Sequence, residues 1–204
     1  MLFRSWYGLF SILIPVYCFL FLPLLSTLSG DTDKFLQRVA NIQFGIMLTI
    51  YCISHVPALL LLNIKNFDSS NNIVLLFFVL FVSQSSDVLQ YIFGKLFGKH
   101  KIAPKVSPSK TVEGFIGGGL AATLIGSSLY WITPFTYWQT LGFAFIIVLM
   151  GFIGGLVLSA IKRSVGAKDW GQLVKGHGGV MDRLDSVAFS APIFFHLVRY
   201  FFTN

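Results

Sequence analysis

Residues 138–161 read WQTLGFAFIIVLMGFIGGLVLSAI, and they set the class of fold. This stretch contains no Asp, Glu, Lys or Arg, and its length is close to the ~20 residues that a helix needs to cross a ~30 Å hydrocarbon layer. Its apolar residues are continuous and do not alternate with polar ones, as they would in a strand of a membrane barrel. The stretch therefore predicts a membrane-spanning helix.

Similar apolar runs occur along the whole chain of 204 residues, which is 55% hydrophobic and 16% aromatic. They cover about 6–27, 42–63, 72–94, 112–133 and 184–203. A soluble core of this size does not need so much apolar surface. We expect an all-α polytopic membrane helix bundle with about six transmembrane helices, forming a single domain over residues 1–204.

The basic residues indicate an orientation. Most of the 15 lysines and arginines lie in the alternate loops at 28–41, 95–111 and 162–183. Because positively charged loops stay on the cytoplasmic side, we expect these three loops there and both termini on the opposite side. This bias also accounts for much of the net charge of +7, so the charge does not indicate a nucleic-acid partner.

The cytoplasmic loop at about 95–111 follows an acidic residue, Asp87, near the end of an apolar run. An ionisable group at membrane depth is costly and typically faces a cavity or the bundle interior. The alternative is a carboxylate that has merely reached the interface. Gly94 and Gly98 stand among lysines but lack the Gly-x4-Gly-Lys-Ser/Thr spacing, which excludes a P-loop.

The same loop ends in Ser-Pro-Ser-Lys-Thr at residues 107–111. A Ser or Thr here can cap the helix that follows, and Glu113 suits the first turn of that helix. Lys110 is unfavourable beside a positive helix N-terminus unless an anion lies nearby. A bound phosphate and a lysine that points into solvent both remain open.

The cytoplasmic loop at about 162–183 concentrates groups suited to phosphate. Its basic side chains match phosphate oxygens, and its glycines let the backbone approach a ligand. Asp182 and Asp185, three residues apart, lie on one helical face and are suited to share a magnesium ion. The alternative is a pair of acids that stabilise a helix N-terminus. His177 fits a structural loop histidine at least as well as a catalytic one.

Two glycine pairs predict close contacts between helices. Gly114 with Gly118, and Gly151 with Gly155, form small-x3-small faces in the fourth and fifth runs.

The loop motifs resemble those of a known family. Residues 159–185 resemble the signature of phosphatidate cytidylyltransferases, or CDP-diacylglycerol synthases, which reads Ser-x-x-Lys-Arg, then Lys-Asp, then His-Gly-Gly-x-x-Asp-Arg-x-Asp. Residues 93–119 resemble the family's upstream block, with Phe-Gly-Lys, Ser-Pro-x-Lys-Thr and Glu-Gly-Phe-Ile-Gly-Gly.

The resemblance implies roles for the matched residues. The expected catalytic residues are Lys168, Asp169, Asp182 and Asp185. The expected substrate-binding residues are Asp87, Ser107, Lys110, Thr111, Ser159, Lys162, Arg163, His177 and Arg183. Asp182 and Asp185 are the expected ligands of Mg²⁺.

The implied reaction transfers CMP from CTP to phosphatidate and yields CDP-diacylglycerol and pyrophosphate for phospholipid synthesis. Gly155 and Leu158 stand where the family usually has Asp and Glu, and that Asp contributes to the metal site. The alternative is therefore a catalytically impaired paralogue that binds lipid or nucleotide as a membrane partner. A small transporter is disfavoured, because its polar residues belong at mid-membrane in broken helices.

The expected location is the bacterial inner (plasma) membrane, with the site facing the cytoplasm. There CTP arrives from water and phosphatidate from the leaflet. Homodimer formation remains open.

Overall fold

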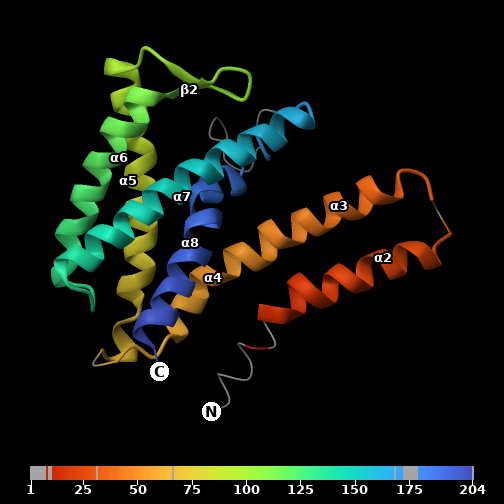
Figure 1. Ribbon diagram of the computed structural model, residues 1–204, viewed down its shortest axis with the longest axis horizontal. Helices are drawn as coiled ribbons and strands as arrows, with labels where there is room; N and C mark the ends of the chain where they lie inside the picture. The colour runs from red at the N-terminus through yellow and green to blue at the C-terminus, as the bar shows by residue number, and fades with distance from the viewer. Residues whose placement is uncertain are drawn as a thin grey trace. The chain divides into compact units, whose positions relative to one another are not determined.

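The computed structural model describes residue 8 and residues 11–30, 32–65, 67–167, 169–171 and 179–203 (Figure 1). These residues are mostly helical, with two short strands. The chain divides into two compact units, one ending at Ser54 and the other beginning at His55. The single domain expected from the sequence stays a prediction.

The first unit is a helical hairpin. A π-helical turn η1 (Leu13–Cys18) leads into α2 (Phe19–Leu28), and α3 (Phe35–Ile46) continues into a second π-helical segment η2 (Met47–Cys52). The Arg38 guanidinium donates to the Ser26 hydroxyl at 3.2 Å, and the Gln43 amide donates to the Phe19 carbonyl at 3.0 Å. These two contacts make α2 and α3 antiparallel neighbours.

The second unit contains the longer helices. Helix α4 (Ile53–Ala58) crosses the boundary between the two units. The second unit then contains η3 (Leu59–Leu61), η4 (Ser69–Asn71), α5 (Ile73–Phe97), α6 (Val112–Ser127), η5 (Ser128–Trp131), α7 (Tyr137–Ser164) and α8 (Met181–Phe202). Helix α5 packs on α6, α6 on α7, and α7 on α8. Phe78, Ile147 and Phe194 are fully buried, and the hydroxyls of Ser83 and Ser190 share a hydrogen bond of 3.1 Å between α5 and α8.

The glycine face on α6 is confirmed. A Cβ atom at Gly118 would lie 2.4 Å from the backbone N and Cα of Gln90, so α5 and α6 need glycine there to approach this closely. The two glycines of the predicted α7 face, Gly151 and Gly155, contact different parts of the protein. Gly151 packs near Ser186 of α8, whereas Gly155 faces the side chain of Lys110.

Four described helical stretches are long and apolar enough to cross a membrane, by length and composition: Phe35–Leu61, Ser69–Phe97, Val112–Trp131 and Tyr137–Ser164. They match the four central runs predicted from the sequence and indicate an integral membrane protein. The expected count of about six is not confirmed. In place of the first run, the described residues form the shorter apolar helix Leu13–Leu28. The last run forms α8, whose first turns carry charge at Asp182, Arg183 and Asp185.

Two expected loops differ from the structure. Helix α3 begins at Phe35, inside the loop expected at 28–41, because scattered polar residues on an exposed face are compatible with a helix. The loop expected at 95–111 contains the last turn of α5 and an antiparallel hairpin of β1 (Lys101–Ala103) and β2 (Ser107–Thr111). The described residues are mostly helical, as expected, and this small two-stranded sheet is an addition that the sequence did not predict.

Candidate active site

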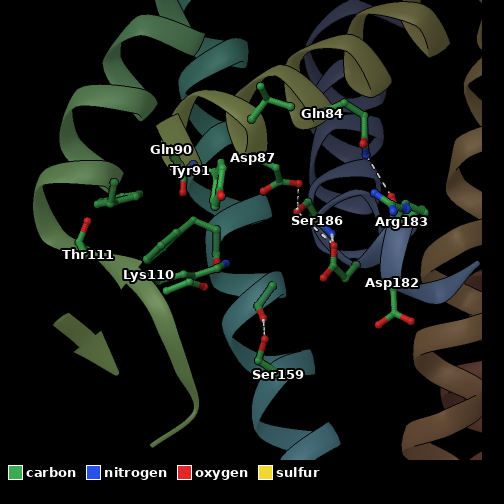
Figure 2. A pocket seen from close by; sticks show the side chains of 16 residues that line it. Gln84, Asp87, Gln90, Tyr91, Lys110, Thr111, Ser159, Asp182, Arg183 and Ser186 are labelled. Carbon is green, nitrogen blue, oxygen red and sulfur yellow. Dashed lines mark hydrogen bonds between the residues drawn. The ribbon is translucent and has the colours of Figure 1, made fainter. Parts of the chain in front are cut away.

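The second unit contains a cavity of about 570 Å³ between α5, β2, α6, α7 and α8 (Figure 2). This volume falls within the range of small-molecule sites. Its lining combines acidic, basic, hydroxyl and aromatic side chains. The lining residues are Gln84, Asp87, Val88, Gln90, Tyr91, Ser109, Lys110, Thr111, Phe115, Phe152, Gly155, Ser159, Asp182, Arg183, Asp185 and Ser186.

The hairpin that carries Lys110 is fastened to the start of α6. The Glu113 carboxylate accepts from the backbone N–H of Lys99 at 3.0 Å and of His100 at 3.2 Å, and it contacts the His100 ring at 2.6 Å. The Thr111 hydroxyl accepts from the Gly114 N–H at 3.1 Å and caps α6. The sequence predicted both the capping hydroxyl and the acid in the first turn.

The Thr111 hydroxyl is also closely surrounded by three glycines. A Cβ atom at Gly94, Gly98 or Gly114 would lie 3.1, 2.7 or 2.8 Å from Thr111 Oγ1, respectively. The absence of these side chains lets α5, the hairpin and α6 converge at one point. This convergence places β2 beside the cavity.

Lys110 extends from β2 into the cavity (Figure 2). Its ammonium lies 4.7 Å from the centre of the Phe152 ring and 3.5 Å from the Phe152 carbonyl oxygen. Burial lowers the pKa of Lys110, while the negative charges of Asp87 and Asp185 oppose that shift. The open alternative of a solvent-directed lysine is therefore wrong.

Asp87 and Asp185 come from α5 and α8 and are joined through Ser186. The Ser186 hydroxyl donates to Asp87 Oδ2 at 2.6 Å, and the Ser186 N–H donates to Asp185 Oδ1 at 2.8 Å. Asp87 thus lines a cavity, as its position in an apolar run predicted. The arrangement concentrates two carboxylates and one ammonium in a half-buried space.

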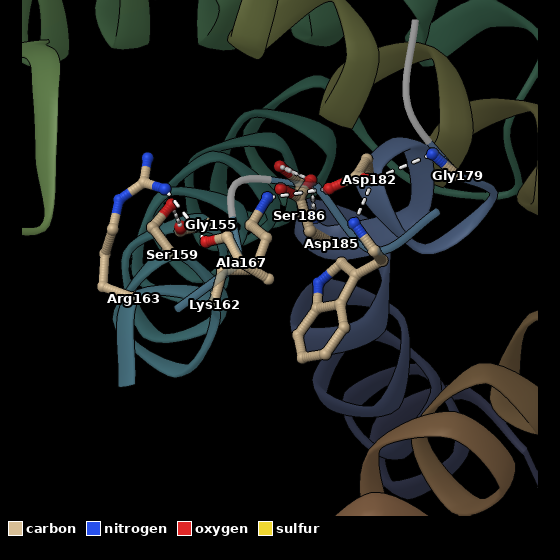
Figure 3. Close-up of polar contacts among 10 residues, drawn as sticks. Gly155, Ser159, Lys162, Arg163, Ala167, Gly179, Asp182, Asp185 and Ser186 are labelled. Atoms are coloured by element: carbon tan, nitrogen blue, oxygen red, sulfur yellow. Dashed lines mark hydrogen bonds and ion pairs between the residues drawn. The ribbon is translucent and has the colours of Figure 1, made fainter. Parts of the chain in front are cut away.

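Asp182 has both carboxylate oxygens engaged by the protein (Figure 3). Oδ1 accepts from the Lys162 ammonium at 2.8 Å, and Oδ2 accepts from the N–H groups of Trp170 at 2.8 Å and Gly179 at 2.9 Å. The side chains of Lys162 and Asp182 are only 11% and 10% exposed. Burial alone would raise the Asp182 pKa, but the Lys162 ammonium and the two amides hold it below its usual range.

Of the remaining basic and hydroxyl candidates, Ser159 and Arg183 line the cavity and Arg163 does not. Ser159 lines the cavity while donating to the Gly155 carbonyl at 2.6 Å. Arg183 lines it from α8, and Gln84 donates to its carbonyl oxygen at 3.0 Å. Arg163 is absent from the lining residues and donates to the Ala167 carbonyl at 3.1 Å.

Of the expected site residues that the structure describes, Ser107 and Asp169, like Lys162 and Arg163, are not among the lining residues. Ser107 is buried in β2 outside the lining, and Asp169 is exposed outside it. Lys168 and His177 lie outside the described residues. Their expected roles stay predictions.

The structure adds lining residues that the motifs did not single out. Gln84 and Tyr91 lie three residues before and four after Asp87, which puts them on the same face of α5. Ser186 directly follows Asp185 and connects it to Asp87. Helical spacing from Asp87 was a usable signal for the first two, whereas the contact of Ser186 depends on how α5 and α8 pack.

The described acidic residues expected to bind magnesium already have partners within the protein. Asp182 uses both oxygens within the protein, and a cationic ammonium accompanies Asp87 and Asp185. Among the described residues, no three His, Cys, Asp or Glu side chains form a group suited to a metal ion. Magnesium binding by Asp182 and Asp185 stays a prediction.

These features define a helical membrane protein with a charged internal site. The chain matches the family model described as "Cytidylyltransferase family" over residues 2–201, and it belongs to that family. The resemblance inferred from the loop motifs is thereby confirmed.

Several curated relatives share part of their length with this chain. It is 42% identical over 198 residues to Escherichia coli (strain K12) YnbB, described as uncharacterized, with 95% of this chain and 65% of the relative covered. It is 43% identical over 110 residues to the phosphatidate cytidylyltransferase of Staphylococcus aureus (strain COL), and the match covers 53% of this chain and 42% of the relative. It is 41% identical over 118 residues to the phosphatidate cytidylyltransferase of Staphylococcus saprophyticus, and the match covers 57% of this chain and 45% of the relative. The chain spans less than two thirds of the length of these relatives.

Proposed function

We propose that this protein transfers CMP from CTP to phosphatidate, giving CDP-diacylglycerol and pyrophosphate. The observation that carries the proposal is the cavity in which Lys110 and Arg183 line the same space as Asp87 and Asp185. Relatives named phosphatidate cytidylyltransferase support the choice of substrates. In this proposal the cavity faces the cytoplasmic surface of a bacterial inner membrane.

The reaction requires anions to be brought together. An oxygen of the ionised phosphatidate phosphate attacks the α-phosphorus of CTP, a new P–O bond forms, and the bond to the β-phosphate oxygen breaks to release pyrophosphate. Basic side chains accelerate such a transfer by positioning the phosphates and stabilising the charge that develops. Lys110 and Arg183 take this role, and Ser159 offers a hydroxyl to the same space.

Magnesium enters the proposal with the nucleotide, bound to the triphosphate oxygens of CTP. Asp87 and Asp185 would repel phosphates on their own. Their proposed role is to orient the neighbouring cationic groups, with Ser186 holding the two carboxylates in place. Lys162 and Asp182 support this arrangement by joining the end of α7 to the start of α8.

The second candidate is a paralogue that binds lipid or nucleotide without turnover. Two observations favour it. Position 155 carries no side chain, and Asp182 is fully engaged by Lys162 and two amides. Both features reduce the number of carboxylate oxygens available in the cavity.

Purified protein in mixed micelles with labelled CTP, phosphatidate and Mg²⁺ separates the two candidates. We expect labelled CDP-diacylglycerol from the natural chain and from Asp68→Asn, which changes an exposed acid that does not line the cavity. We expect a large loss in Asp185→Asn. Product no greater than in Asp185→Asn would exclude the enzyme. Retention of labelled CTP in equilibrium dialysis would then support the paralogue.

A further inference from the structure

The position of the Lys110 ammonium depends on a missing side chain. An ideal Cβ atom built on Gly155 would lie 2.6 Å from Lys110 Nζ, closer than real Cβ contacts allow. The ammonium also lies over the Phe152 ring, 4.7 Å from its centre, and 3.5 Å from the Phe152 carbonyl oxygen. Gly155 and Phe152 of α7 therefore form a socket for the end of this side chain.

The charges around that socket need a cation. Asp87 and Asp185 are held near each other by Ser186, and both interact electrostatically with Lys110. Two partly desolvated carboxylates are costly without positive charge nearby. Among the described residues, the buried Lys162 ammonium is already paired with Asp182 at 2.8 Å, and Arg183 lines the same cavity from an exposed position.

We propose that Lys110, seated in the gap at Gly155, is a built-in counter-cation for Asp87 and Asp185 and takes the place of a protein-bound divalent ion. The inference rests on the proposed function only in treating this cavity as the substrate site. A second cation placed at the two acids would meet repulsion from the ammonium, which is stronger in this half-buried cavity than in bulk water. The protein without nucleotide consequently binds divalent cations weakly at this site.

Titration of the detergent-solubilised protein with Mn²⁺ alone, followed by electron paramagnetic resonance, tests this directly. We expect Lys110→Met to bind Mn²⁺ at least about tenfold more tightly than the natural chain, because the repelling charge is gone. Lys105→Met removes the same charge from an exposed position in the same hairpin. It should match the natural chain, and Lys110→Arg should restore weak binding.

Gly155→Ala provides a second, independent variant. Its added methyl group must move the ammonium while leaving the charge of the protein unchanged. We expect the Mn²⁺ affinity of Gly155→Ala to rise as well. If Lys110→Met does not fold, the titration of Gly155→Ala alone tests the proposal. A single tight Mn²⁺ site in the natural chain, or unchanged affinity in a folded Lys110→Met or Gly155→Ala variant, would overturn the proposal. Since neither CTP nor phosphatidate is present, absence of turnover would leave this result unaffected.

Discussion

The anchor at Asp182 leads to a quantitative prediction about stability. Asp182→Ala removes the partner of the Lys162 ammonium and the acceptor of two backbone N–H groups. Breaking a buried ion pair from one side costs about 3–5 kcal/mol, and both side chains here are about one tenth exposed, so water screens the pair little. The Gly179 amide adds about 1.5–3 kcal/mol for loss of a charged acceptor, whereas water can replace the acceptor of the exposed Trp170 amide.

We therefore expect Asp182→Ala to lower the free energy of unfolding by about 5–8 kcal/mol. Lys162→Met should cost less, about 3 kcal/mol, because the Asp182 carboxylate keeps its two amide donors. Equilibrium unfolding in detergent micelles, followed by tryptophan fluorescence, measures both values. Asp169→Ala is the matched control, since it removes an exposed acid from the same segment. A loss for Asp182→Ala within about 0.5 kcal/mol of that control would refute the anchoring role.

Three further predictions concern pH, helix packing and capping. The pKa of Asp182 is lowered in the folded state, so the stability that its carboxylate contributes is present at neutral pH and is lost as the pH falls below the ordinary carboxyl range. In this acidic range the free energy of unfolding of Asp182→Ala should therefore depend less on pH than that of the natural chain. Gly118→Ala should destabilise the protein by several kcal/mol because its Cβ meets the α5 backbone, whereas Gly142→Ala, with open space around it, should be neutral or slightly stabilising in the same unfolding assay. Thr111→Ala should cost about 1 kcal/mol through loss of the α6 cap, and Thr111→Ser should recover most of it; equal stability of the two variants would contradict the capping role.

The sequence predicted the central membrane helices well because their signal is local. Continuous apolar runs at 72–94 and 138–161 correspond closely to α5 and α7. The start of α3 was missed because Gln37 and Arg38 are polar without breaking a helix. The hairpin was missed because its two strands are very short and because the second strand, β2, contains Pro108.

The candidate site was predictable in its residue types and less so in its pairings. Asp87, Lys110, Ser159, Asp182, Arg183 and Asp185 were all expected and all line the cavity. Their partners follow from helix packing, which spacing along the chain does not reveal. Asp182 and Asp185 share a helix, yet Asp182 pairs with Lys162 of α7 while Asp185 contacts Ser186, the partner of Asp87 in α5.

The crowding around the Thr111 hydroxyl limits how this part of the chain can change in evolution. Gly94, Gly98 and Gly114 each place a hydrogen atom where a methyl group would contact Thr111. A side chain gained at Gly94 requires a smaller residue at 111 or a shift of the hairpin, whereas one gained at Gly98 or Gly114 would also meet the backbone of α5 and requires the backbone to shift. Substitutions at Gly94 and Thr111 should therefore appear together in related sequences, and in a library of variants changes at Gly98 and Gly114 should be depleted even when residue 111 is smaller.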